Sequence, residues 1–293
     1  MRILILGGSG MLGHRLWIEL SKVHDAWITV RASATMIPDL PGVDRNWIRE
    51  GVEATNFDAV SRAITSIQPN VVINCIGIVK QLPLSNDPVT SIEINALLPH
   101  RISLISREAK IRIIHFSTDC VFSGRKGMAY TEDDQPDAED LYGRTKFLGE
   151  VSYPPHTLTL RTSIIGRELR TRHGLVEWFL SQRQAVNGYQ KAIFSGFTTG
   201  AIATILIDHV LPNPQLTGVY HLSSYPISKY ELLQLINKEY GLGKEIKPDT
   251  SVVCNRILDS SRFRKETGFT PPTWPEMIQA MQSETIPYDE RKR

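Results

Sequence analysis

The sequence has few cysteines and no long apolar run, and both shortages narrow the classes of protein it can be. The three cysteines among 293 residues are Cys75, Cys120 and Cys254, which are too few and too widely spaced for a disulfide framework or paired metal ligands. The opening MRILILGG holds five apolar residues, which is short for a signal peptide or a membrane span. We therefore expect a cytoplasmic protein with no metal centre and no membrane contact.

An excess of charge of one sign is also missing. Lys and Arg number 33 against 31 Asp and Glu, which gives a net charge of +2 with histidine neutral, and no basic block occurs. This balance argues against a nucleic-acid partner. Apolar residues make up 41% of the chain, so a sizeable core is expected, and the length suits one large α/β domain or two lobes that share a core.

The first half of the chain alternates short β-rich runs with longer helical stretches. We expect strands at Ile3–Leu6, Trp27–Val30, Val71–Asn74 and Ile111–Phe116, and helices at Met11–Ser21, Asp58–Ile67 and Val89–Glu108. The strands are continuously apolar, as in a parallel sheet with helices on both faces.

In the second half, strand and helix patterns alternate less regularly. Amphipathic helices are expected near Lys229–Tyr240 and Trp274–Met281, and the polar residues 284–293 are expected to fray. We predict a dinucleotide-binding domain over residues 1–165 plus about 198–222. A smaller substrate-binding lobe is predicted over about 166–197 and 223–285, followed by a polar tail over 286–293.

A glycine-rich turn follows the first strand. Gly7, Gly10 and Gly13 give the spacing GxxGxxG between a strand and a helix. Glycine lets the backbone approach a pyrophosphate, and the helix N-terminus offers free N–H groups and the positive end of its dipole. Because the turn has this context, we favour phosphate binding over an ordinary turn. The predicted fold is α/β, a Rossmann-type doubly wound parallel sheet with a smaller C-terminal lobe.

The end of the second strand carries a cation and no acid. A cofactor with a free ribose 2′-hydroxyl usually meets an acidic residue here. Arg31 can instead pair with a 2′-phosphate, and Ser33 can add a hydrogen bond. We therefore favour NADP(H), with NAD(H) as the alternative; Arg31 as a solvated surface cation is the plainer interpretation.

A tyrosine and a lysine lie one helical turn apart in LYGRTKFLGE. Tyr142 and Lys146, at i and i+4, share one face of a helix. The ammonium is expected to lower the pKa of the phenol, so that Tyr142 exchanges a proton with a carbonyl or alcohol oxygen. Upstream, Thr118 ends an apolar strand, where it can present its hydroxyl to the same oxygen or merely cap the strand.

Together these motifs resemble a known family. STDCVFSG, YGRTKFLGE, LRTS and LDSSRFRKETGFTPPTW occur in that order after the glycine turn. They resemble the STDYVFDG-like strand end, YGxTKxxGE helix, RTS segment and late LDxSKL…GF.PP.W stretch of the dTDP-4-dehydrorhamnose reductases, within the extended short-chain dehydrogenases. The similarity covers nearly the whole chain.

The resemblance implies a role for each matching residue. Thr118, Tyr142 and Lys146 would be catalytic: Tyr142 protonates the reduced oxygen, Lys146 also holds the nicotinamide ribose, and Thr118 binds the carbonyl. Cofactor contacts would come from Gly7, Gly10, Met11, Leu12, Gly13, Arg31, Ser33, Val52, Cys75, Ile76, Gly77, Asn95, Ser117, Tyr142, Lys146 and Thr162. Substrate contacts would come from Lys80, Gln81, Thr118, Asp119, Cys120, Ser163, Ile164 and Arg256.

Several positions depart from the family pattern. Lys80 and Gln81 stand where small residues and a threonine are usual, and Gly51-Val52 replace an aspartate that commonly contacts adenine. Val252-Val253 replace an Arg-Pro pair, so Arg256 either supplies the phosphate contact or lies on the surface. These departures leave the nucleotide and the sugar open.

The resemblance therefore implies an NADPH-dependent reductase of a UDP- or dTDP-linked 4-keto-6-deoxy sugar, serving surface-polysaccharide precursors. One alternative is an epimerase-reductase in which Cys120 moves a proton with the help of His173, although Cys120 as a small packing residue is favoured. Another is an NADP-binding regulatory subunit without turnover. A homodimer is compatible with each.

Overall fold

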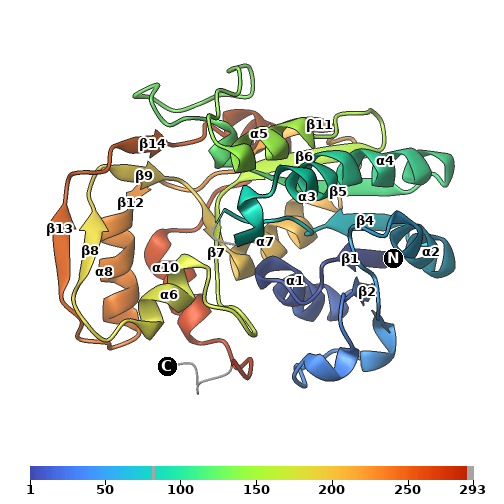
Figure 1. The fold of residues 1–293 in the computed structure, drawn as a ribbon, viewed down its shortest axis with the longest axis horizontal. Helices are drawn as coiled ribbons and strands as arrows, with labels where there is room; N and C mark the ends of the chain where they lie inside the picture. Colours follow the sequence, from blue (N-terminus) through green and yellow to red (C-terminus); the bar gives the residue numbers. More distant parts are fainter. Residues whose placement is uncertain (81–82, 289–293) are drawn as a thin grey trace.

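The structure, a computed structural model, describes residues 1–80 and 83–288 and centres on a seven-stranded sheet (Figure 1). The strand order is β11-β6-β5-β4-β1-β2-β3, and every neighbouring pair is parallel. The bounds are β1 (Arg2–Leu6), β2 (Asp25–Thr29), β3 (Ile48–Arg49), β4 (Val71–Asn74), β5 (Arg112–Thr118), β6 (Thr157–Thr162) and β11 (Gly218–His221). This confirms the predicted Rossmann-type fold, whose strand order reverses between β1 and β4.

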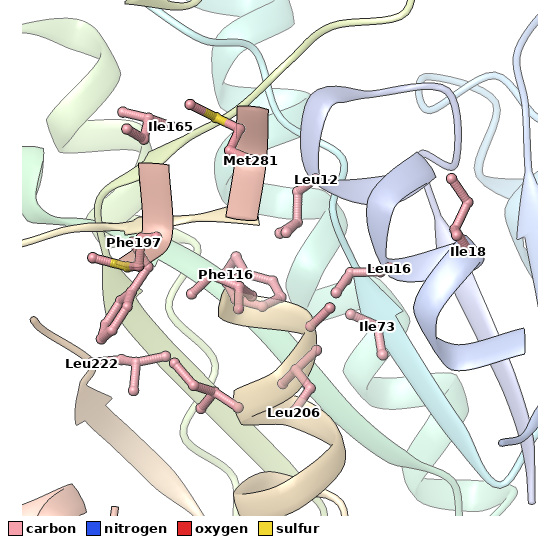
Figure 2. Packing of buried hydrophobic residues seen from close by; sticks show 14 of the residues in the cluster. Leu12, Leu16, Ile18, Ile73, Phe116, Ile165, Phe197, Leu206, Leu222 and Met281 are labelled. Carbon is pink, nitrogen blue, oxygen red and sulfur yellow. The ribbon is translucent and has the colours of Figure 1, made fainter. Parts of the chain in front are cut away.

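Side chains of successive strand residues enter two separate apolar layers. Ile5 and Ile73 lie in the layer that contains α1 and α7, whereas Leu4 and Val72 lie in the layer of α2 and α4. Figure 2 shows Leu16 of α1 in the first layer, beside residues of β4 and β5. Burial on both faces explains why the strands are continuously apolar in sequence.

The helices around this sheet follow the expected order, with one difference. They are α1 (Met11–Ser21), α2 (Phe57–Ile67), α3 (Pro88–Ser91), η4 (Ile92–Leu97), α4 (Leu98–Glu108), α5 (Leu141–Leu148), α7 (Thr199–Ile205) and η6 (Leu206–Val210). The stretch predicted as one helix over Val89–Glu108 contains the π-helical turn η4. A π turn shifts the side-chain register within a helix and is common near functional sites.

Small sheets and further helices form the other end of the molecule, on the left of Figure 1. Strand β8 (Val186–Tyr189) pairs with β13 (Ile246–Asp249), β9 (Ala192–Phe194) lies between β12 (Ile227–Ser228) and β14 (Cys254–Arg256), and β7 (Ile164–Ile165) pairs with β10 (Phe197–Thr198). The helices there are α6 (Leu175–Ser181), α8 (Lys229–Glu239) and α10 (Trp274–Gln282), whereas α9 (Ser261–Thr267) packs beside β11 of the main sheet, with Phe263 against Tyr220. Helices α8 and α10 match the two predicted ones; the division into lobes stays a prediction.

Short 3-10 turns connect these elements. They are η1 (Ala34–Met36), η2 (Arg45–Trp47), η3 (Pro83–Asn86) and η5 (Asp119–Val121). Within residues 1–80 and 83–288, the helices are all too short or too polar to cross a membrane.

The segment after α10 packs against α1 instead of fraying, so that prediction was wrong for residues 284–288. Ile286 and Tyr288 are buried in the main apolar core. The Tyr288 hydroxyl donates to Glu284 Oε2 at 2.7 Å and lies 3.2 Å from His14 Nε2, and Glu284 is 3.5 Å from Arg15 Nε. The polar composition of this segment did not reveal that Ile286 and Tyr288 are buried, or that the Glu284 carboxylate has buried partners. Residues 289–293 lie outside the described part.

A truncation tests this docking. Deleting residues 284–293 is expected to lower the free energy of unfolding by about 3 kcal/mol or more, since burial of one large apolar side chain contributes roughly 1.5–3 kcal/mol. Urea denaturation measures the loss. Deleting only residues 289–293 is the matched control and should leave the unfolding midpoint unchanged; equal midpoints for the two truncations would contradict the docking.

Candidate active site

The turn between β1 and α1 has the shape of a phosphate-binding loop. Gly7 has a positive φ of 83°, which a residue with a side chain rarely adopts. The Gly10 N–H donates to the Gly7 carbonyl at 3.0 Å, and a Cβ on Gly13 would overlap that carbonyl. The helix therefore begins directly on the turn.

The N-terminus of α1 is open to an anion. No side chain caps it, and its first turn contains no acidic residue. Met11 and Leu12 open the helix, so their backbone lies where a pyrophosphate would bind. These features fit the pyrophosphate of a dinucleotide.

The loop after β4 lies beside this turn. The Cys75 N–H donates to the Leu6 carbonyl at 3.0 Å, and a Cβ on Gly7 would touch Cys75 and Ile76. Gly77 follows, close to the amide oxygen of Asn95. The structure places these residues at the carboxyl edge of the sheet, and their predicted position beneath the cofactor stays a prediction.

The side chain of Asn95 is engaged in hydrogen bonds within the protein, which the sequence did not predict. Its buried amide accepts from the Ile78 N–H at 2.8 Å, donates to the Ile78 carbonyl at 3.1 Å and lies 3.4 Å from the Thr145 hydroxyl. Asn95 thus joins the loop after β4 to helix α5. Its contact with the cofactor stays a prediction.

Thr118, Tyr142 and Lys146 meet at the carboxyl end of β5. Thr118 is the last residue of β5, and its hydroxyl donates to Asp119 Oδ1 at 3.2 Å and lies near enough to the Tyr142 phenol to lower the pKa of that phenol. Lys146 is buried on α5 and donates from Nζ to the Phe116 carbonyl at 2.7 Å. The three residues that the motifs singled out therefore lie together, as a catalytic triad requires.

Close packing holds α5 in this position. A Cβ on Gly143 would overlap the Cys120 carbonyl, and one on Gly149 would overlap the Asn95 carbonyl. At the start of the helix, Asp140 caps the Gly143 N–H at 2.7 Å. Helix α5 therefore lies closer to η5 and η4 than side chains at these two positions would allow.

The electrostatics of the pair differ from the prediction. Burial raises the pKa of Tyr142, Cys120 raises it further, and the Thr118 hydroxyl opposes them. Burial lowers the pKa of Lys146 to about 8, against the charges of Glu150 and Cys75. The phenol is thus kept protonated, contrary to the expected lowering of its pKa, and is suited to donate a proton.

Arg256 reaches the substrate side of this triad. Its guanidinium donates to the Phe122 carbonyl at 2.7 Å and lies 3.5 Å from Cys120 Sγ. Arg256 also opposes the burial that raises the pKa of the adjacent Asp119. Of the two interpretations of Arg256, this position favours a role in the site over an isolated surface residue.

Lys229 is a site residue that the sequence analysis missed. It is the first residue of α8, and its charge opposes the raised pKa of buried Asp119. Its Nζ also lies 4.2 Å from the centre of the Phe194 ring. The only sequence signal is the helix start Ser228-Lys229, because α8 meets η5 only through the tertiary fold.

Cys120 has no proton-transfer partner in His173. Burial and Asp119 raise the pKa of the thiol to about 12, and Arg256 lowers it only in part. His173 is exposed. It lies in a loop whose next residue, Gly174, is close to Met11 and Glu168. The structure therefore supports Cys120 as a packing residue more than as an acid or base.

The other predicted site residues are scattered along the same edge. Ser117 donates to Glu150 at 2.7 Å, and Thr162 pairs in register with Thr118. The Ser163 carbonyl accepts from Phe197, and Ile164 begins β7. Lys80 pairs with Asp140 at 2.8 Å, and Gln81 lies outside the described residues.

The ribose end of the site contains acids that the sequence did not reveal. Arg31 is largely exposed and lies 3.8 Å from Glu53, while Ser33 donates to Glu50 at 3.4 Å. Val52 is buried, and its N–H donates to the Val30 carbonyl at 3.0 Å. Arg31 and Ser33 are at the predicted strand end, but both face carboxylates.

Comparison with known proteins agrees with this geometry. The chain is 25% identical to a probable low-salt glycan biosynthesis reductase of Haloferax volcanii, over 97% of this chain and 98% of the relative. It is 24% identical to the beta subunit of methionine adenosyltransferase 2 from Mus musculus, over 97% and 91%. The crystal structure of dTDP-4-dehydrorhamnose reductase from Bacillus anthracis in complex with NADP has the same fold, with a TM-score of 0.77, 20% identity, and coverage of 96% of this chain and 98% of that chain.

A family model decides the classification. The family described as RmlD substrate binding domain matches residues 1–286. The match includes the glycine turn, the strand end at Thr118 and the helix with Tyr142 and Lys146. The chain therefore belongs to this family and is an NAD(P)-dependent oxidoreductase, as its motifs predicted.

Proposed function

We propose that this protein is an NADPH-dependent reductase of a nucleotide-linked 4-keto-6-deoxy sugar, with UDP or dTDP as the nucleotide. The observation that carries the proposal is the meeting of Thr118, Tyr142 and Lys146 at the sheet edge that also bears the glycine turn. The names of relatives support a sugar nucleotide and a place in the synthesis of surface polysaccharide, since they include a dTDP-4-dehydrorhamnose reductase, a glycan biosynthesis reductase and a spore coat polysaccharide biosynthesis protein. The cytoplasm is the compartment we expect.

The chain's own residues would each perform one part of the reduction. A bound dinucleotide supplies the hydride that reduces the carbonyl carbon. Tyr142, held in its protonated form by burial, gives its proton to the oxygen that becomes a hydroxyl. Thr118 orients that oxygen through its own hydroxyl, and Lys146, fixed on the Phe116 carbonyl, positions the ribose next to Tyr142.

The substrate side supports an anionic ligand. Arg256 and Lys229 both lie near Asp119 and Cys120, close to the triad. Two cations from separate elements suit the diphosphate of a sugar nucleotide better than they suit a neutral alcohol or ketone. The nucleotide base and the sugar stereochemistry are set by contacts beyond these residues.

A substrate screen tests the proposed function. Purified protein with NADPH should consume at least one of the UDP-, dTDP- or GDP-linked 4-keto sugars, seen as loss of NADPH absorbance and, by NMR, as a nucleotide-linked sugar with a hydroxyl in place of the keto group. NMR also gives the product configuration, which separates a plain reductase from an epimerase-reductase. Dinucleotide binding without turnover on any of these sugars would favour the regulatory alternative and contradict the proposal.

Substitution of the proton donor tests the mechanism. Tyr142→Phe should lower kcat about 100-fold or more while NADPH affinity changes little, because only the proton-donating oxygen is lost. Steady-state kinetics and direct titration with NADPH measure the two effects separately. Phe147→Tyr, which adds a hydroxyl on the exposed side of the same helix, is a control that should keep full turnover. A Tyr142→Phe variant as active as the parent would contradict this role.

A further inference from the structure

The parallel pairing of β2 with β3 brings an acid to the predicted ribose site. Ile28 pairs with Ile48 and Thr29 with Arg49, and the Val30 N–H donates to the Arg49 carbonyl at 2.9 Å. Glu50 is the next residue, so it leaves the sheet at the edge where Arg31 leaves β2. The acid that β2 lacks in sequence is therefore supplied by its neighbouring strand.

Glu50 accepts hydrogen bonds from the loop after β2. Its Oε1 accepts from the Ala34 N–H at 2.6 Å and from the Ser33 hydroxyl at 3.4 Å. Arg45 binds the other side of the same segment, since its Nη2 donates to the Ala34 carbonyl at 2.5 Å. Contacts on both sides of Ala34 fix the loop, and they hold the carboxylate in one position.

The cation at this site is held more loosely. Arg31 Nε lies 3.8 Å from Glu53, and three quarters of the Arg31 side chain is exposed (75%). An exposed pair of this length contributes little and leaves the guanidinium able to turn. Arg31 can therefore turn toward a nearby anion, whereas Glu50 is held by the Ala34 N–H and the Ser33 hydroxyl.

We infer that Glu50 is a specificity residue that narrows the preference of this enzyme for NADPH and lets it also accept NADH. A 2′-phosphate bound at the end of β2 would draw on the donors of this loop, and Glu50 already holds the Ser33 hydroxyl and the Ala34 N–H with a carboxylate that would repel the phosphate. A 2′-hydroxyl can instead donate to that carboxylate. Arg31 therefore favours NADPH, and Glu50 favours NADH. The inference rests on the proposed use of a dinucleotide.

Direct binding measures this choice without turnover. Titration with NADPH and with NADH, followed by nicotinamide fluorescence, gives the ratio of the two dissociation constants. Glu50→Gln should shift this ratio toward NADPH by about tenfold, which corresponds to ~1.4 kcal/mol. Arg31→Ala should shift it toward NADH. Glu108→Gln, which removes a carboxylate at the opposite end of the sheet, should leave the ratio unchanged.

The outcomes separate this inference from the proposed function. An unchanged ratio in both Glu50→Gln and Glu50→Ala, with melting temperatures like the parent's, overturns the role of Glu50 alone. Glu50→Asp keeps the charge and should stay near the parent ratio, so a shift as large as that of Glu50→Gln also overturns it. A parent protein that binds neither dinucleotide overturns both this inference and the proposed function.

Discussion

The chemistry of this protein depends on how closely α5 lies against the end of β5. Gly143 and Gly149 let the helix approach the carbonyl groups of Cys120 and Asn95, where a Cβ would overlap them. At that distance the buried Lys146 reaches the Phe116 carbonyl, and the Tyr142 phenol lies near the Thr118 hydroxyl. A side chain at either glycine would push the helix away from its neighbours, so we expect both glycines to be needed for this geometry.

Burial adjusts the two titrating groups in complementary ways. The pKa of Tyr142 is raised and that of Lys146 is lowered to about 8, in each case chiefly because the site excludes water. Each shift disfavours the charged form of its group. A protonated phenol beside an ordered hydroxyl is the arrangement that reduction of a carbonyl requires, since the product oxygen must receive a proton.

The sheet topology brings the remaining parts together. The glycine turn follows β1, Cys75 follows β4, Thr118 ends β5 and Thr162 ends β6, so all four lie at the carboxyl edge of one parallel sheet. Ligands bind at this edge in doubly wound folds, beside the point where the strand order reverses. Segments far apart in sequence thus share one edge, where we propose a ribose region at β2 and a substrate region near Arg256.

The sequence predicted those parts of the candidate site whose residues lie close together in the chain. The glycine turn, the strand that ends in Thr118 and the i, i+4 pair on α5 each have a signal within about ten residues. Glu50 had no such signal, and for Lys229 the sequence marked only the start of a helix, because their positions near the site arise only when β3 pairs with β2 and α8 approaches η5. The docked Tyr288 was missed for the same reason, since its partners lie on α1, at the other end of the chain.

The fold compensates for one departure from the family pattern. Val252-Val253 replace an Arg-Pro pair, yet Arg256 on β14 brings a guanidinium to within 3.5 Å of Cys120 Sγ. A shift of a few residues along an extended segment therefore retains a cation near the triad. No composition or periodicity argument can find such a compensation, because it depends on where the segment lies in space.

Transfer of deuterium from the cofactor tests the central claim most directly. NADPH that carries deuterium at both C4 positions is incubated with a keto-sugar nucleotide that the protein consumes, and NMR locates the label in the product. The account predicts one deuterium on the former carbonyl carbon of the sugar, delivered to a single face, with a solvent proton on the adjacent oxygen. A product without deuterium at that carbon, or with deuterium on both faces, would contradict it.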